Sequence, residues 1–217
     1  MRESELMRIP FKSQFWVVGQ LPHFDQETIK AEPQLWRADR SFAMQNGGPI
    51  TRAFIEALGW PSLILDSRVH MLMPRMYPCI PGWHLDDAPR TRPDGQPDHV
   101  TPVYKSEHCA AVLGDASLTV FALGDLELED VPIGGGVVYQ EWHFAIEKLV
   151  EQGTLRAQAI KEGQLVKFGW GSFHRGASAS KRGWRMFIRA TRQTQIPARN
   201  EIRNQTQVYL TEPFTGW

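Results

Sequence analysis

The feature that most constrains the fold is a series of short strand-like segments, separated by turn residues, that begins near residue 61. Helical spacing of apolar residues is clear in only two places, residues 49–58 and 141–152. The chain therefore lacks the regular strand–helix alternation that a parallel α/β sheet requires. We predict a mainly β fold with flanking helices, a sandwich or jelly roll. The expected strands are 63–65, 68–73, 110–113, 118–123, 164–169 and 184–191, with a short edge at 208–210.

This pattern predicts one domain, 1–217, in three parts. Residues 1–60 are expected to be helical or irregular and to pack on the β core at 61–192, and 193–217 form a C-terminal tail. In the first part we expect a short helix at 33–44 and a second one that begins at Pro49 and ends at Gly59.

Two connections in the predicted core carry specific expectations. The turn Gly114-Asp115 should join the strands on either side of it into a hairpin, and 125–132 should be a connector. Residues 89–103 are rich in Pro, Asp, Gly and Arg and show no periodicity, which predicts a long loop. Loops of this kind often close over a binding site, and the sequence leaves open whether this one is a lid.

Charge and composition narrow the possible partners. Twenty-four basic residues balance twenty-four acidic ones, which disfavours a nucleic-acid surface. No apolar run approaches the roughly 18–20 residues of a membrane span, and the first residues lack the apolar segment of a secretory signal. Cys79 and Cys109 are too few for a disulfide scaffold. We therefore expect a reduced, cytoplasmic protein, whose oligomeric state the sequence does not indicate.

The most informative spacing is His84-Leu85-Asp86. Residues two apart on an extended strand point to the same face, about 7 Å apart along the chain, so this imidazole and this carboxylate should project together and Asp87 away from them. Ninety residues later, a glycine-flanked turn presents His174. Two histidines and one carboxylate are typical of Fe(II) centres that keep open coordination positions. The alternative is a surface histidine beside a solvated acidic pair.

An arginine is expected to be part of the same candidate site. In the strand at 184–191, Arg185, Phe187 and Arg189 share one face. A buried guanidinium is costly without an anionic partner, and a bound carboxylate is a natural one for Arg185. Arg189 has two interpretations that the sequence does not separate: it binds an acidic group of a substrate or cosubstrate, or it forms a structural salt bridge.

The order His84-Leu85-Asp86, His174, Arg185 resembles the HxD…H…R signature of Fe(II)/2-oxoglutarate-dependent dioxygenases, over roughly residues 61–192. The resemblance implies a double-stranded β-helix (jelly roll, cupin-like). It implies that His84, Asp86 and His174 bind Fe(II) and that Arg185 binds the distal carboxylate of the cosubstrate 2-oxoglutarate. The implied reaction uses O₂ and releases succinate and CO₂. The acid at Asp86 favours hydroxylation over halogenation, of an unidentified small polar molecule.

Two other functions remain open. A cupin-like, metal-dependent isomerase, lyase or hydrolase would work without O₂, and Arg185 would bind the carboxylate of its substrate. A non-enzymatic jelly roll would bind a ligand without a metal. Four further residues are candidates for substrate binding, each with a core or surface role as its alternative: His70, Tyr77, Trp83 and Trp170.

Overall fold

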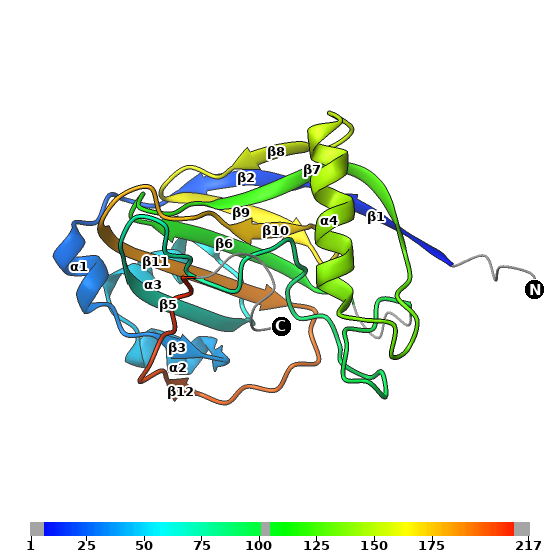
Figure 1. Cartoon of the computed structure of the whole chain (residues 1–217). Helices are drawn as coiled ribbons and strands as arrows, with labels where there is room; N and C mark the ends of the chain where they lie inside the picture. Colours follow the sequence, from blue (N-terminus) through cyan, green and yellow to red (C-terminus); the bar gives the residue numbers. More distant parts are fainter. Residues whose placement is uncertain (1–6, 101–104, 211–217) are drawn as a thin grey trace, which may run out of the picture.

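The computed structural model describes residues 7–100 and 105–210, and β-strands dominate it (Figure 1). The strands are β1 (Arg8–Ser13), β2 (Phe15–Gln20), β3 (Leu35–Trp36), β4 (Ala38–Asp39), β5 (Ile64–Leu72), β6 (Glu107–Leu113), β7 (Thr119–Glu129), β8 (Arg156–Ala159), β9 (Gln164–Gly169), β10 (His174–Gly176), β11 (Gly183–Arg192) and β12 (Glu201–Ile202). The helices are α1 (Gln26–Ala31), α2 (Arg40–Asn46), α3 (Pro49–Leu58) and α4 (Val138–Glu151). The fold is therefore mainly β with a few helices, as predicted.

Two antiparallel sheets face each other, as in a β-sandwich. The larger has the strand order β2-β9-β6-β11-β5-β4, and in the smaller β7 pairs with β1, β10 and β8. Side chains from both sheets meet between them; for example, the rings of Phe121 on β7 and Phe168 on β9 lie 5.1 Å apart, edge to face. In the described residues the sheets do not close into a barrel.

Helices cover the outer faces of both sheets (Figure 1). Helices α1 to α3 pack against the larger sheet, and α4 packs against the smaller one. The prediction for α3 is confirmed: it begins at Pro49 and stops at Gly59, whose positive φ of 66° suits glycine. The predicted helix at 141–152 is confirmed as α4, which begins three residues earlier.

The prediction that residues 1–60 are helical or irregular is wrong for residues 8–20, which form two strands. Strand β1 alternates exposed and buried residues, and its inward side chains Ile9, Phe11 and Ser13 face the core under α4. Strand β2 forms an edge of the larger sheet. The helix expected at 33–44 is also displaced: it begins at Arg40, where the Asp39 side chain accepts a hydrogen bond from the Phe42 amide.

The predicted hairpin around Gly114 is wrong, because β6 and β7 belong to different sheets. Leu113 pairs with Met186 on β11, whereas Thr119 pairs with Gly176 on β10. Gly114 has a φ of 79° and its amide donates to the Glu162 carboxylate, so the chain leaves one sheet here and crosses to the other. The expected connector at 125–132 is mostly strand, since β7 continues to Glu129.

The C-terminal tail returns to the body of the protein. Strand β12 pairs with β3, and an isolated bridge joins Tyr209 to Tyr77 in place of the edge strand predicted at 208–210. Strands 63–65 and 68–73 form the single strand β5. Within the described residues, none of the helices has the length and apolar character needed to cross a membrane.

Candidate metal centre

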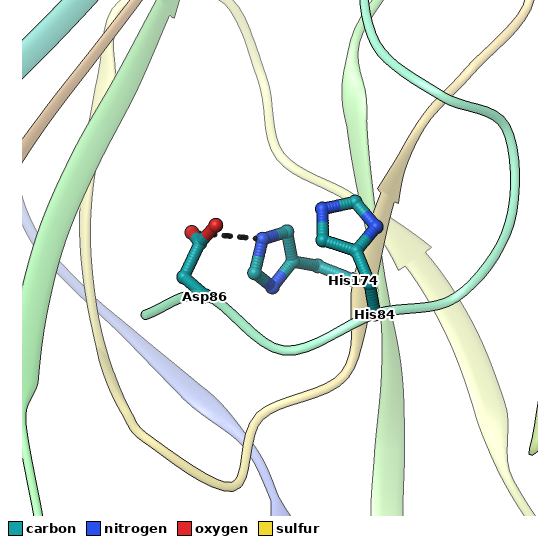
Figure 2. A group of neighbouring side chains, drawn as sticks. All are labelled: His84, Asp86 and His174. Atoms are coloured by element: carbon teal, nitrogen blue, oxygen red, sulfur yellow. Dashed lines mark ion pairs between the residues drawn. The ribbon is translucent and has the colours of Figure 1, made fainter. Parts of the chain in front are cut away.

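Backbone pairing brings two distant histidines together. The amide of His84 donates to the His174 carbonyl oxygen at 3.0 Å, and the amide of His174 donates back at 3.1 Å. Residues that pair in this way carry neighbouring side chains on one face, and the two ring centroids lie 4.8 Å apart. Asp86, two residues after His84, turns its carboxylate toward the His174 ring (Figure 2).

The side chains of His84, Asp86 and His174 form a metal-ligand geometry. One ligand atom from each lies within 4.8 Å of the other two. Asp86 Oδ2 and His174 Nε2 are 3.0 Å apart, which is about the separation of two atoms that each bind one metal at 2.1 Å and at right angles. Asp86 Oδ2 is buried; it has no aligned hydrogen bond among the described residues, but Arg189 Nη1 lies 2.6 Å from it as an ion-pair partner. Two imidazoles and one carboxylate that converge in this way offer a ligand set for a divalent cation.

Both histidines are oriented by their other ring nitrogen. Nδ1 of His84 lies 3.0 Å from the Gly82 carbonyl oxygen, and Nδ1 of His174 lies 3.0 Å from that of Ser172. A carbonyl oxygen only accepts, so each Nδ1 carries a proton and Nε2 is the nitrogen left to bind a metal. Metal-binding histidines commonly have this second contact, because it sets the tautomer and the ring orientation.

The charges of the site also suit a cation. Burial, with the neighbouring His174 and Arg189, lowers the pKa of His84 to about 4, so this ring is neutral at pH 7. Burial tends to raise the pKa of Asp86, but the positive charge of Arg189 and the contact with His174 outweigh it and hold that pKa well below its usual range. The set therefore stands at neutral pH with an ionised carboxylate.

Arg189 forms structural ion pairs. It contacts Asp86 Oδ2 at 2.6 Å, Asp87 Oδ1 at 2.9 Å and Asp66 Oδ2 at 3.6 Å. Asp87 turns away from the cluster, with a φ of 56°, and also accepts a hydrogen bond from Thr191. Of the two interpretations of Arg189, the salt bridge is the one that the structure contains. The prediction that Asp86 rather than Asp87 faces the histidines is confirmed.

The cluster opens into a cavity of about 360 Å³ between the sheets. Arg185, Phe187 and Arg189 on β11 line one wall, as the alternation on that strand predicts. Asp66, Arg68 and His70 project from the neighbouring strand β5.

Arg185 is buried in this cavity without a carboxylate partner. The side chain is 3% exposed, Nε donates to the Ser117 carbonyl oxygen at 2.7 Å, and Nη2 donates to Thr119 Oγ1 at 3.3 Å. No described acidic residue lies within ion-pair distance of it. Burial lowers the pKa of Arg185 to about 10, with Arg68 acting in the same direction. The guanidinium remains charged at neutral pH and has no counter-ion among the described residues.

Comparison with protein-family models, curated protein sequences and solved structures gave no match. The function of this chain therefore has to be inferred from the geometry of its own side chains.

The four candidates for substrate binding lie in different places. His70 is buried and lines the cavity. Trp83 does not line it: the ring is fully buried under α4, and its Nε1 donates to Glu147, so the core role applies. Trp170 is half-buried and lines a separate space of about 20 Å³ beside Asp86. Tyr77 pairs with Tyr209 through the backbone, and Tyr209 is the tyrosine that lines the main cavity.

Sequence reasoning missed several residues of the cavity, among them Thr119, Cys79 and Tyr209. Thr119 lies two residues before Phe121 on β7, so both side chains point to the same buried face, and strand alternation could have predicted this. Cys79 lies in a segment without regular structure. Tyr209 arrives from the returning tail, for which no local pattern gives a signal.

The predicted loop at 89–103 is described up to residue 100, and residues 101–104 lie outside the described residues. The described part is held to the body of the protein. Arg92 forms ion pairs with Asp94 and Asp130, and the His99 ring packs 4.7 Å from that of Trp142. Closure of this loop over the cavity stays a prediction.

The lowered pKa values of His70, His84, His99 and His108 predict acid sensitivity in the metal-free protein. Burial is the largest cause in each case, lowering the pKa of His70 to about 3 and those of His84, His99 and His108 to about 4. In the unfolded chain these rings titrate near 6.5, so below that pH the unfolded state binds more protons and stability falls as the pH falls. Each ring lowers the free energy of unfolding by about 1.4 kcal/mol per pH unit in this range, so the four together lower it by roughly 5 kcal/mol per pH unit.

That loss is comparable to the whole free energy of unfolding of a typical domain, about 5–15 kcal/mol. We expect urea denaturation midpoints to drop sharply between pH 7 and pH 5 and the chain to unfold before pH 4. Midpoints that stay constant over this range would show that the rings are protonated in the folded state.

Proposed function

We propose that this chain is an Fe(II)- and 2-oxoglutarate-dependent dioxygenase that hydroxylates a small polar molecule and releases succinate and CO₂. One observation carries the proposal: the His84–Asp86–His174 cluster and Arg185, a buried guanidinium with no acidic partner among the described residues, line the same cavity. A divalent cation would bind the cluster, and a chelator of that cation with a free carboxylate would supply the anion that Arg185 needs. The two facing antiparallel sheets, with β6 and β7 in different sheets, are also consistent with a double-stranded β-helix.

The donor set suits Fe(II). Two imidazoles and one carboxylate leave coordination positions open, whereas a structural zinc site uses four ligands, commonly including cysteine. Neither Cys79 nor Cys109 belongs to the cluster. His84, Asp86 and His174 would hold the metal, and the bound metal would supply oxidation of a C–H bond by O₂, coupled to decarboxylation of the oxoacid.

Other residues of the cavity would bind 2-oxoglutarate and hold the metal ligands in position. Arg185 would bind the distal carboxylate of 2-oxoglutarate through the N–H groups that Ser117 and Thr119 leave unused. Arg189 would keep Asp86 ionised and in place through its ion pair. The cavity wall at Phe187 and Ile80 would limit the access of water to the reacting groups.

The test adds Fe(II) and 2-oxoglutarate to the purified protein under anaerobic conditions. We expect the weak visible charge-transfer band of the chelate, and then succinate when O₂ is admitted. An absent band in folded, metal-loaded protein would contradict the proposal. Metal binding without an effect of 2-oxoglutarate would favour a cupin-like isomerase, lyase or hydrolase. Failure to bind any divalent metal would favour a non-enzymatic jelly roll.

A further inference from the structure

His70 is a buried polar side chain whose ring nitrogens have no aligned hydrogen bond among the described residues. It is 2% exposed, and the backbone of Gln207 lies near the ring. The ring lines the main cavity. Buried polar groups in native proteins are normally satisfied, and leaving one unsatisfied costs free energy. An unsatisfied imidazole that faces a cavity therefore suggests a partner that enters the cavity.

His70 stands directly beside Arg185. The two residues are paired in register between β5 and β11, and both side chains line the cavity. Cβ atoms of directly paired strand residues are about 4.5–5.5 Å apart. A small anion bound by the guanidinium is therefore within reach of the imidazole.

The chemistry of the two groups is complementary. Arg185 already uses Nε and one N–H of Nη2 in contacts with the protein, so its other N–H groups can bind one side of a carboxylate. A carboxylate has about four acceptor positions. Burial, with the positive charges of Arg185 and Arg68, lowers the pKa of His70 to about 3, so the ring is neutral and retains one N–H to donate.

We infer that His70 is a second hydrogen-bond donor to the carboxylate that Arg185 binds. The pair then forms a two-donor site that selects dicarboxylic oxoacids over monocarboxylic ones. This inference rests on the proposed function, since it assigns His70 a role in binding the cosubstrate. His70 would act as a binding residue and would not contact the metal.

The experiment measures ligand binding to the Mn(II)-loaded protein by calorimetry, which avoids turnover. Two ligands are compared: 2-oxoglutarate, and 2-oxopentanoate, which has a methyl group in place of the distal carboxylate. We expect His70→Leu to weaken binding of 2-oxoglutarate about tenfold or more, the effect of losing a hydrogen bond to a charged group. Binding of 2-oxopentanoate should change less than about twofold, and His70→Gln, which keeps a donor, should recover part of the loss.

Stability separates this role from a structural one. Because His70 is unsatisfied in the fold, His70→Leu should unfold at the same temperature as the parent protein or higher. His23→Leu, at an exposed residue outside the cavity lining, is the matched control and should bind both ligands normally.

Equal weakening of both ligands by His70→Leu, or no weakening of either, would overturn the inference and leave the proposed function intact. A parent protein that binds Mn(II) but not 2-oxoglutarate would overturn both.

Discussion

Replacing Asp86 by asparagine should weaken metal binding about 100-fold or more and abolish succinate formation while the chain stays folded. The amide removes the only negative charge among the three proposed ligands. Losing a contact outside the ligand set typically weakens metal binding about 10–100-fold, so losing a charged ligand should weaken Mn(II) binding by about 100-fold or more. Calorimetric titration with Mn(II), together with a succinate assay, measures both effects. The fold should persist because Arg189 keeps two other carboxylates, Asp66 and Asp87.

Asp87→Asn is the matched control, because it makes the same chemical change one residue further along. Asp87 contacts Arg189 and Thr191 but lies outside the cluster, so this variant should weaken Mn(II) binding by less than about tenfold. The reverse order, with Asp87→Asn the more damaging, would show that Asp87 is the ligand. It would also refute the alternation argument on which the candidate site was built.

Replacing Arg185 by methionine should remove binding of 2-oxoglutarate without affecting the metal. Truncating one partner of a buried, hydrogen-bonded charge pair costs about 2–5 kcal/mol, which corresponds to a dissociation constant raised at least about 30-fold. Methionine has a similar length and is apolar, so it can fill the space without a charge. The measurement is titration of the Mn(II)-loaded variant with 2-oxoglutarate, beside a titration of the metal-free variant with Mn(II).

The unfolding temperature of Arg185→Met tests whether Arg185 binds a ligand or stabilises the fold. Removing a buried charge that has no acidic partner among the described residues should leave the unfolding temperature unchanged or raise it. Arg185→Lys should bind 2-oxoglutarate with intermediate affinity, because an ammonium retains the charge but lacks the planar array of donors. A clear loss of stability in Arg185→Met, with normal binding of 2-oxoglutarate, would assign Arg185 a structural role.

Local patterns predicted several parts of the molecule well. Helix α3 was recognisable because Pro49 and Gly59 mark its two ends and apolar residues recur at helical spacing between them. Strand β9 and most of β11 followed from apolar alternation. The orientation of Arg185 and Asp86 also followed from alternation, because neighbouring residues of an extended chain face opposite sides.

Other parts depended on partners that are distant along the chain. Strand β1 is stabilised by pairing with the far end of β7 and by packing under α4, so its six residues alone looked like irregular structure. The turn at Gly114 has the composition of a hairpin turn, but β6 pairs with β11 and β9 and leaves β7 to the opposite sheet.

For the candidate site, the chain order alone indicated which side chains are candidate ligands and which way each one faces along its own segment. Their convergence was decided only in three dimensions, by the backbone bridge between His84 and His174 and by the pairing of β5 with β11. The same pairing placed His70 beside Arg185, and the folded chain brought Arg189 into ion pairs with Asp86 and Asp87. Side-chain direction is a local property of the backbone, whereas a shared cavity depends on contacts between segments far apart in sequence.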